Sequence, residues 1–532
     1  MNQITPPPKI DIIPSSAPFS EAQRSWLNGF FAGLLSGDAA TPLSAEQGAA
    51  VLQGSAGDGD DGEAPWHDQT MPIADRMKLA EGRPLRRRMM AAMAQQDCGQ
   101  CGYNCNDYSE AIAGKNEARL NLCVPGGKET ARMLKALYED LDKAPAAVTA
   151  AAAVAVSAEA SQPGRSRDNP VAATFLSRRL LNKPGSEKET WHIEFDLSEA
   201  SLDYVVGDSF GIFARNDLGL VDQIIALLGS SHTTRVNGKT LRECLTEDVS
   251  LSPAPDTLFE LISFISGGAL REKARALAQG EDPDGDAATL DVMAALQKFS
   301  GVRPHPEAFV EALEPLQPRL YSISSSHKAT PGQLSLTVDC VRYVVGKRRR
   351  LGLASTFLAE RINPGDRLKV YVQKSHGFAL PQDCRTAIIM IGPGTGVAPF
   401  RAFLLDRKAT GAPGKNWLFF GHQRSDCDFF YADELNAMKT TGLLTRLSLA
   451  WSRDGDKKFY VQDRMREVGR ELWTWLADGA HLYICGDAKR MAKDVERALV
   501  DIVAQFGARS TDDAVAFVAD LKKKGRFQQD VY

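Results

Sequence analysis

Four cysteines stand close together in the sequence, Cys98, Cys101, Cys105 and Cys123, with the spacing C-x2-C-x3-C-x17-C. Four thiolates gathered in this way bind either a tetrahedral zinc ion or an iron–sulfur cluster. Three crowded cysteines and one distant one favour a cubane 4Fe-4S cluster, because structural zinc sites usually take two pairs. We therefore expect a 4Fe-4S cluster here, with another cluster, zinc or free thiols as the alternatives.

A second group of chemically suited residues is the run Arg319, Leu320, Tyr321 and Ser322. An FAD site must neutralise a pyrophosphate, cover a large flat ring and place a hydrogen-bonding group near the flavin N5 atom. One arginine, one aromatic ring and one hydroxyl supply all three. Alternation along a strand puts Arg319 and Tyr321 on one face and Ser322 on the other. A strand end with a buried tyrosine and a serine-rich turn is the alternative.

A glycine-rich turn, Gly392 to Pro399, follows an apolar strand at 386–391 and contains Gly394 and Thr395. Such a turn at the C-terminal end of a strand lets a dinucleotide lie close to the backbone. Its spacing differs from GxGxxG, so the turn alone is a weak signal. We expect a nicotinamide coenzyme to bind here.

The choice between NADPH and NADH depends on the residues after a later strand, LSLAW. Ser452 and Arg453 close that strand, and Lys458, Tyr460 and Gln462 follow within ten residues. A 2′-phosphate needs cationic and hydroxyl partners, whereas NAD favours an acidic residue at its ribose. The pattern predicts NADPH, with a solvated mixed-charge turn as the alternative.

The elements that must position these residues follow from the hydrophobic pattern. Strand-like runs come first, at 191–197, 334–338 and 368–372, with a helical insertion at about 220–315. Apolar strands then alternate with helices from residue 386 onward, which predicts an α/β domain with a parallel sheet. The cysteines lie between one helix that runs through 86–90 and a second at 129–141. A further helix is expected at 18–36.

Bulk properties narrow the class of protein. The chain has 532 residues, enough for several domains, and a formal net charge of -4, which gives no support to nucleic-acid binding. The sequence shows neither an apolar run long enough to span a membrane nor a secretory signal. We therefore expect a cytoplasmic protein whose nine cysteines are thiols or metal ligands.

The C-terminal two-thirds of the chain resembles the ferredoxin–NADP reductase family. The resemblance is carried in order by RLYSISSS, LTVDCVRY, GLASTFLAERI and MIGPGTGVAPFRAFL. More narrowly, residues 166–532 are similar to the FAD/NADPH half of bacterial assimilatory sulfite reductase flavoproteins, through KNWLFFGHQ, CGDAKRMAKDVERAL and the terminal QQDVY. The resemblance implies an FAD-binding antiparallel β-barrel interrupted by a helical connecting domain, then an NADP-binding α/β domain.

The resemblance implies a role for individual residues at the flavin. Arg319 would meet the pyrophosphate, Tyr321 would stack on the isoalloxazine ring and Ser322 would lie near N5. The other residues implied to contact FAD are Leu320, Thr337, Val338, Asp339, Tyr343, Gly352, Leu353, Ala354, Ser355 and Tyr532. Leu353 departs from the sulfite reductase pattern, which usually has a glycine there, and we expect the position to tolerate a side chain.

The resemblance also implies the residues of hydride transfer and of coenzyme binding. Cys485 would lie beside the nicotinamide C4 atom, and with Ser322 and Asp530 it would orient transfer to the flavin. Tyr532 would cover the flavin and swing aside for nicotinamide. The residues implied to bind NADP are Gly394, Thr395, Ser452, Arg453, Lys458, Tyr460, Gln462 and Asp494.

The four-cysteine stretch resembles the small iron–sulfur domain in the B subunit of bacterial Rnf-type electron-transport complexes. The shared pattern is CGxCG, a third cysteine, a YAEAI-like run and C-x-P-G-G, but the gap before the third cysteine is one residue shorter here. Sulfite reductase flavoproteins carry an FMN domain at their N-terminus, and nothing in residues 1–165 resembles one. An iron–sulfur cluster in that place could take single electrons from the flavin.

Five segments follow. They are an N-terminal helix with a loosely ordered segment (1–66), the iron–sulfur domain (67–142), an alanine-rich linker (143–168), the FAD-binding domain (169–383) and the NADP-binding domain (384–532).

The predicted function is an NADPH-dependent reductase that passes electrons through FAD and a 4Fe-4S cluster to a protein acceptor. The expected acceptor is a sirohaem sulfite reductase subunit. A nitrite, nitrate or other oxidoreductase as acceptor is one alternative. The other is a flavoreductase whose cysteines form a zinc docking module.

Overall fold

The computed structural model describes residues 64–143 except 67–70, 97–100, 102, 104 and 124, and residues 162–532 except 376 and 489. The helix expected at 18–36, Cys98 and most of the expected linker lie outside the described residues. No helix within the described ranges is long and apolar enough to cross a membrane.

Four helices form the four-cysteine unit. They are α3 (Ile73–Leu79), α4 (Leu85–Ala92), α5 (Cys105–Ala113) and α6 (Gly127–Lys143). Met89, Tyr108, Ile112 and Leu134 are buried in a core of their own. The helices expected at 86–90 and 129–141 are present as α4 and α6. Helix α5 lacks a strong apolar period and was not predicted; it begins at the third cysteine.

An antiparallel sheet of six strands comes next, in the order β6-β3-β10-β1-β2-β7. The strands are β1 (Val171–Leu180), β2 (Thr190–Asp196), β3 (Ser209–Ile212), β6 (Arg319–Ser322), β7 (Gln333–Asp339) and β10 (Arg367–Gln373). A bridge between Ile323 and Leu336 joins the two edges of the sheet, as closure into the predicted barrel requires. Phe175, Phe195 and Phe210 fill its interior.

The expected helical insertion separates β3 from β6. It contains α7 (Leu218–Leu228), β4 (Arg235–Val236), β5 (Lys239–Thr240), α8 (Leu241–Glu247), α9 (Asp256–Ile265), α10 (Gly268–Ala278), a 3-10 turn (Ala287–Thr289), α11 (Val292–Lys298) and α12 (Pro306–Glu311). Phe259, Phe299 and Phe309 are buried in a separate core. After β7 come the hairpin β8 (Arg342–Val345) and β9 (Arg348–Leu351), then α13 (Leu353–Thr356) and a π-helical turn (Phe357–Arg361).

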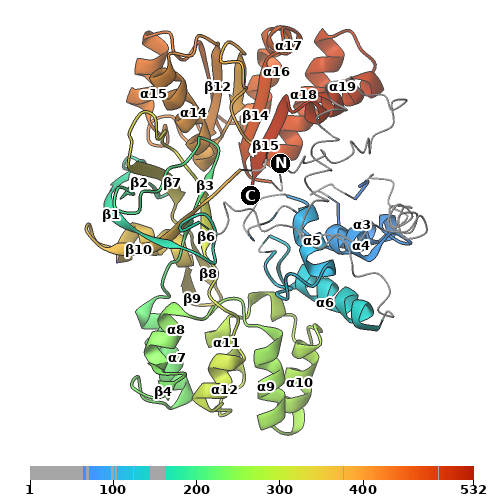
Figure 1. Cartoon of the computed structure of the whole chain (residues 1–532), viewed down its shortest axis with the longest axis vertical. Coiled ribbons are helices and arrows are strands. Elements are labelled where there is room, and N and C mark those ends of the chain that lie inside the picture. The colour runs from blue at the N-terminus through green and yellow to red at the C-terminus, as the bar shows by residue number, and fades with distance from the viewer. Residues whose placement is uncertain are drawn as a thin grey trace, which may run out of the picture. The chain divides into compact units, whose positions relative to one another are not determined.

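A five-stranded parallel sheet forms the C-terminal domain, in the order β13-β12-β11-β14-β15. Its strands are β11 (Ile388–Ile391), β12 (Asn416–His422), β13 (Arg446–Trp451), β14 (His481–Gly486) and β15 (Phe527–Val531). One apolar core packs under α14 (Val397–Thr410) and α15 (Ala432–Thr440). The other packs under α16 (Val461–Glu467), α17 (Gly469–Ala477), α18 (Met491–Phe506) and α19 (Thr511–Lys523) (Figure 1). Strands β11 to β14 were predicted, and β15 was not.

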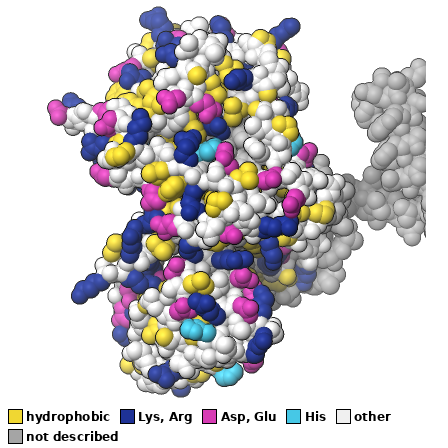
Figure 2. Space-filling view, turned by 90° about the vertical axis from the view of Figure 1, so that its left-hand side faces the viewer, with side chains coloured by type: hydrophobic (Ala, Val, Ile, Leu, Met, Phe, Trp, Pro, Cys, Tyr) yellow, Lys and Arg dark blue, Asp and Glu magenta, His cyan; other side chains and the backbone are white. Residues whose placement is uncertain are grey.

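Acidic and basic side chains are interspersed over the face of the molecule in Figure 2, and apolar side chains lie between them. Many charged side chains of the described residues are paired; Arg446 with Glu471 and Lys239 with Asp248 are examples. This mixed surface agrees with the small net charge of the sequence.

Candidate active site

A hollow of about 730 Å³ lies between the barrel and the parallel-sheet domain, a size typical of cofactor sites. Strands β6 and β7, the β8–β9 hairpin and the start of α13 line it from one side. Thr395, Ala398 and residues 530–532 line it from the other. Every residue expected at FAD is among the lining residues: Arg319, Leu320, Tyr321, Ser322, Thr337, Val338, Asp339, Tyr343, Gly352, Leu353, Ala354, Ser355 and Tyr532.

Strand β6 supplies the first residues of this site. Arg319 and Ser322 lie on opposite faces of β6, yet both border the hollow. This is possible because β6 is the first strand in the order of the sheet. The Arg319 guanidinium donates to the backbone oxygens of Gln317 (3.1 Å) and Pro318 (3.3 Å). Burial lowers its pKa, and among the described residues it has no carboxylate partner. A buried cation of this kind fits an anionic ligand such as a pyrophosphate.

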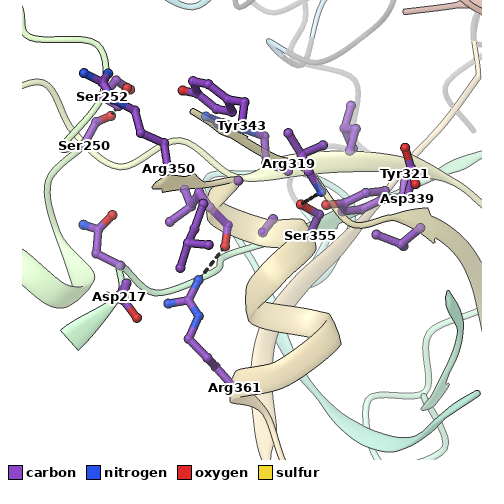
Figure 3. Close-up of a pocket in the computed structure, with 18 of the residues that line it drawn as sticks. Asp217, Ser250, Ser252, Arg319, Tyr321, Asp339, Tyr343, Arg350, Ser355 and Arg361 are labelled. Atoms are coloured by element: carbon purple, nitrogen blue, oxygen red, sulfur yellow. Dashed lines mark hydrogen bonds between the residues drawn. The ribbon is translucent and has the colours of Figure 1, made fainter. Parts of the chain in front are cut away.

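Four further arginines border the hollow and were not predicted: Arg348, Arg349, Arg350 and Arg361. Figure 3 labels the last two. Arg350 is buried and forms an ion pair with the buried Asp291 of the helical insertion (3.4 Å). Arg361 donates to the backbone oxygens of Leu353 and Arg215, both at 2.9 Å. The Nε atoms of Arg350 and Arg361 are buried and have no hydrogen-bond partner among the described residues. The run KRRR at 347–350 was the signal that could have found Arg348, Arg349 and Arg350.

The short helix α13 starts beside the hollow at Gly352. A Cβ atom at Gly352 would lie 2.7 Å from the Ser355 Oγ atom and 2.9 Å from Val341 Cβ, so a side chain is excluded there. Leu353 has an ordinary helical backbone and is not among the residues with positive φ. The leucine in place of the usual glycine therefore causes no strain.

Three polar residues meet where the two domains face each other. The Ser322 hydroxyl donates to Asp530 Oδ2 (2.5 Å), and the Cys485 thiol donates to the same oxygen (3.6 Å). The parallel register of β14 and β15 pairs Cys485 with Asp530. Burial raises the pKa of both the Asp530 carboxyl and the Cys485 thiol. The structure therefore brings together the three residues that the resemblance implies at hydride transfer.

Tyr532 lies at the mouth of the hollow with half of its surface exposed. Its hydroxyl is 2.6 Å from Thr395 Oγ1, and its backbone bonds to Gly486 and Ala488. The backbone is therefore fixed while the ring is held by a single polar contact. Such an aromatic ring can cover a flat ligand and move when that contact breaks.

The glycine-rich turn approaches the end of β14 closely. A Cβ atom at Gly396 would lie 2.1 Å from the backbone oxygen of Cys485, so only glycine fits. Gly394 has φ +60° and precedes α14, whose N-terminus faces the site. A nucleotide can therefore lie close to the backbone here.

The residues expected at the 2′-phosphate follow β13. The Ser452 amide donates to the His422 backbone oxygen (2.9 Å), and the Arg453 amide donates to that of Gln423 (2.8 Å). The Arg453 guanidinium pairs with Glu187 (2.5 Å). Lys458 and Tyr460 are exposed a few residues further on, with Gln462 in the first turn of α16. Asp494, in the first turn of α18, instead faces Arg497 (3.6 Å).

Three of the four cysteines can be placed. Cys101, Cys105 and Cys123 line one small hollow together with Met93, Tyr103 and Tyr108. Cys98 lies outside the described residues. Burial raises the pKa of the Cys123 thiol. Hydrogen bonds from the backbone N–H groups of Ala94 and Gly126 to its sulfur act against this rise without cancelling it. Within the described ranges no three His, Cys, Asp or Glu side chains lie close enough to hold a metal ion.

Comparisons with known proteins agree with this geometry. A model of the FAD binding domain matches residues 163–282 and 232–357, and one of the oxidoreductase NAD-binding domain matches residues 390–497. The chain is similar to NADPH sulfite reductase flavoprotein alpha-components. The one from Photorhabdus laumondii is 42% identical over 367 residues, which cover 68% of this chain and 61% of the relative.

Two other relatives give the same result. The alpha-component of an Escherichia coli strain is 43% identical over 379 residues, covering 69% of this chain and 61% of its own length. That of Klebsiella pneumoniae is 40% identical over 439 residues, covering 80% of this chain and 71% of its own length. The chain thus spans 61% of the length of the first two relatives.

Proposed function

Since the chain belongs to the family of NADPH sulfite reductase flavoprotein alpha-components, we propose that it is an NADPH-dependent reductase that binds FAD and passes electrons to a protein acceptor. The observation that carries the proposal is the meeting of Ser322, Cys485 and Asp530 beside the hollow. Bound FAD would supply the redox chemistry, namely hydride acceptance and one-electron transfer, while the residues of the chain bind and orient the reactants.

The hollow fits FAD through its charge and its aromatic residues. Arg319 and Arg361 both border the hollow and form no salt bridge with a carboxylate among the described residues, so a pyrophosphate would neutralise them. Arg350 is already paired with Asp291. Tyr321 and Tyr532 line the same hollow and can pack on a flat ring. The protein contributes binding and orientation here, and no side chain needs to act as a strong acid or base.

NADPH would bind along the C-terminal edge of the parallel sheet. The turn at Gly394 and Thr395 leaves room for the nicotinamide half, and Ser452 and Arg453 would hold the 2′-phosphate. Cys485 and Ser322 would then align the nicotinamide and the flavin through their shared bonds to Asp530. We propose no acidic residue as a partner of the adenosine ribose hydroxyls, the feature that would have favoured NADH.

Coenzyme choice provides the test. Replacing Arg453 by Gln removes the cation, so kcat/KM for NADPH should fall on the order of 10- to 100-fold while that for NADH stays unchanged. The measurement is NADPH- and NADH-dependent reduction of an artificial acceptor by the FAD-loaded chain. An equal loss with both coenzymes would contradict the proposed 2′-phosphate site.

The four-cysteine unit is proposed to hold a 4Fe-4S cluster through Cys98, Cys101, Cys105 and Cys123. The spacing of the four cysteines carries this proposal. Cys101, Cys105 and Cys123 line one small hollow, but within the described residues they do not lie close enough together to hold a metal ion. A cluster there would supply one-electron chemistry. Elemental analysis of anaerobically purified protein should give about four irons per chain, and bound zinc without iron would contradict the proposal.

The proposed acceptor is the sirohaem subunit of a sulfite reductase, because the relatives are named for that enzyme. Fold alone does not fix an acceptor. Purified sulfite and nitrite reductases should therefore be tested side by side for NADPH-dependent turnover with this chain. Turnover only with the nitrite enzyme would replace the proposed acceptor.

A further inference from the structure

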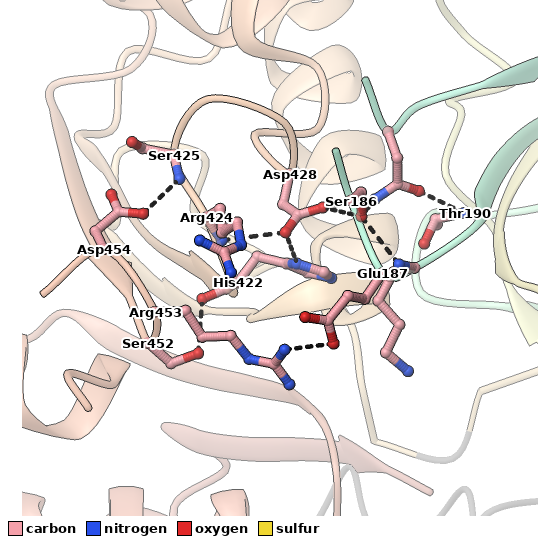
Figure 4. Close-up of polar contacts among 12 residues, drawn as sticks. Ser186, Glu187, Thr190, His422, Arg424, Ser425, Asp428, Ser452, Arg453 and Asp454 are labelled. Carbon is pink, nitrogen blue, oxygen red and sulfur yellow. Dashed lines mark hydrogen bonds and ion pairs between the residues drawn. The ribbon is translucent and has the colours of Figure 1, made fainter. Parts of the chain in front are cut away.

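The loop that connects β1 to β2 (residues 181–189, the β1–β2 loop) belongs to the FAD-binding barrel but is bonded to the parallel-sheet domain. The Lys183 amide donates to the Cys427 backbone oxygen (2.9 Å). The Asn182 side chain and the Ser186 hydroxyl both donate to Asp428 Oδ1, at 2.8 and 2.5 Å. Three hydrogen bonds therefore fix the position of this loop. Figure 4 shows the one from Ser186 to Asp428.

Asp428 is a strong anchor for the loop because it is fully buried and still charged. Burial alone would raise its pKa, but the bonds from Ser186 and Asn182 and the nearby His422 hold the pKa below its ordinary value. The Arg424 amide also donates to this carboxylate (3.1 Å). A buried carboxylate with this many donors gives the loop one defined conformation.

That conformation places Glu187 against Arg453. The Glu187 carboxylate accepts from the Arg453 guanidinium at 2.5 Å, and both side chains are partly exposed (58% and 39%). The backbone of Arg453 is itself fixed, because its N–H group donates a hydrogen bond to the Gln423 backbone oxygen. The positive field of Arg424 acts on Glu187 as well. The Glu187 carboxylate, which belongs to the FAD-binding barrel, is thus already paired with Arg453, the cation that is proposed to bind the 2′-phosphate.

We propose that Glu187 is a built-in competitor of the coenzyme's 2′-phosphate, an inference that rests on the proposed role of Arg453. A phosphate monoester must displace the carboxylate before it can bond to the guanidinium. The displaced contact is a partly exposed ion pair, so it weakens binding by a modest factor, about two- to fivefold. A coenzyme without the 2′-phosphate leaves the pair in place and is unaffected. Glu187 therefore reduces the preference for NADPH over NADH and eases release of the bound coenzyme.

Calorimetric titration of the FAD-loaded full chain with 2′,5′-ADP and with 5′-ADP tests this role. Glu187→Gln should bind 2′,5′-ADP about two- to fivefold more tightly than the unchanged protein and should bind 5′-ADP equally well. Glu199→Gln is the matched control, because it removes the same charge from an exposed pair with Arg367 (3.0 Å) outside the site. It should leave both affinities unchanged.

The outcomes separate this inference from the proposed function. Unchanged affinity of Glu187→Gln for 2′,5′-ADP, or an equal gain for both nucleotides, overturns the competitor role and leaves the NADPH site intact. If the wild-type protein binds 2′,5′-ADP no better than 5′-ADP, both the competitor role of Glu187 and the proposed 2′-phosphate site at Arg453 are overturned. A gain of the same size in Glu199→Gln would show a general charge effect and also overturns the role of Glu187.

Discussion

The flavin site and the four-cysteine unit place their chemical groups by different means. At the flavin site, the register of β14 and β15 sets Cys485 beside Asp530, and β6 brings Ser322 to the same carboxyl. In the four-cysteine unit, Cys105 begins helix α5, but Cys101 lies in a turn and Cys123 in an irregular segment before α6. A sheet can align side chains without a ligand, whereas donors on loops are drawn together by the metal that they bind.

The largest expected effect tests the loop-borne side of this comparison. Cys123→Ser removes one of the four proposed ligands, so bound iron should be lost and electron delivery to the protein acceptor should cease. NADPH-dependent reduction of a small artificial acceptor at the flavin should persist. Iron analysis and the two activity assays measure this. Cys384→Ser, at an exposed cysteine outside the unit, is the control and should change neither.

Retention of iron in Cys123→Ser would show that this sulfur is not a ligand. Loss of flavin activity together with the iron would show that the two sites are not independent, and the comparison would then fail.

The next effect concerns FAD retention. Arg319→Ala removes a buried cation from the sheet-borne site, and FAD affinity should fall on the order of 100-fold or more. The measurement is the FAD content of the purified variant and its recovery in added FAD. Arg179→Ala, at an exposed position on β1, should keep full FAD. An Arg319 variant that purifies with full FAD would contradict the proposed pyrophosphate contact.

A smaller effect is expected for the polar set that aligns hydride transfer. Ser322→Ala and Asp530→Asn should each lower kcat on the order of 10- to 100-fold with little change in KM for NADPH. The double variant should lose little more than either single one, because both remove the same hydrogen bond. Stopped-flow reduction of the flavin by NADPH is the measurement. Additive losses would show that the two side chains act separately.

Much of the C-terminal half could be predicted from its residues. The apolar runs that became β11 to β14 and the helical insertion are clear in the sequence, and the motif at 319–322 led directly to the hollow. Strand β15 was missed because FQQDV has three polar residues out of five and becomes a strand only by pairing with β14. That pairing is a long-range contact, and no local pattern reports it.

The ion pairs that cross between elements were equally invisible. Nothing in the sequence near Glu187 indicates that it meets Arg453, because the two are brought together by bonds to Asp428. The four-cysteine unit shows the opposite case. The spacing of its cysteines predicts the ligands, but the path of the loops that surround a metal does not follow from residue spacing alone.

The last prediction concerns stability rather than activity, and it tests which half of the chain responds to acid through His192. Its ring lies 3.1 Å from the Tyr431 hydroxyl of the parallel-sheet domain. Burial, aided by the nearby Arg401, lowers the pKa of His192 to about 4. The unfolded chain binds a proton near pH 6.5 and the folded chain does not, so stability is full above about pH 6.5. It should fall by up to about 3 kcal/mol as the pH drops towards 4.

The described residues of the four-cysteine unit contain no histidine, so this loss should appear in the C-terminal half first. Urea unfolding followed from neutral to acidic pH should show a shallower loss in His192→Gln than in the unchanged protein. Part of the loss remains, because burial also lowers the pKa of His422 and His481. His232→Gln, at an exposed ring, should keep the full pH dependence. An identical pH dependence in His192→Gln would mean that the titration of this histidine does not contribute to the loss of stability.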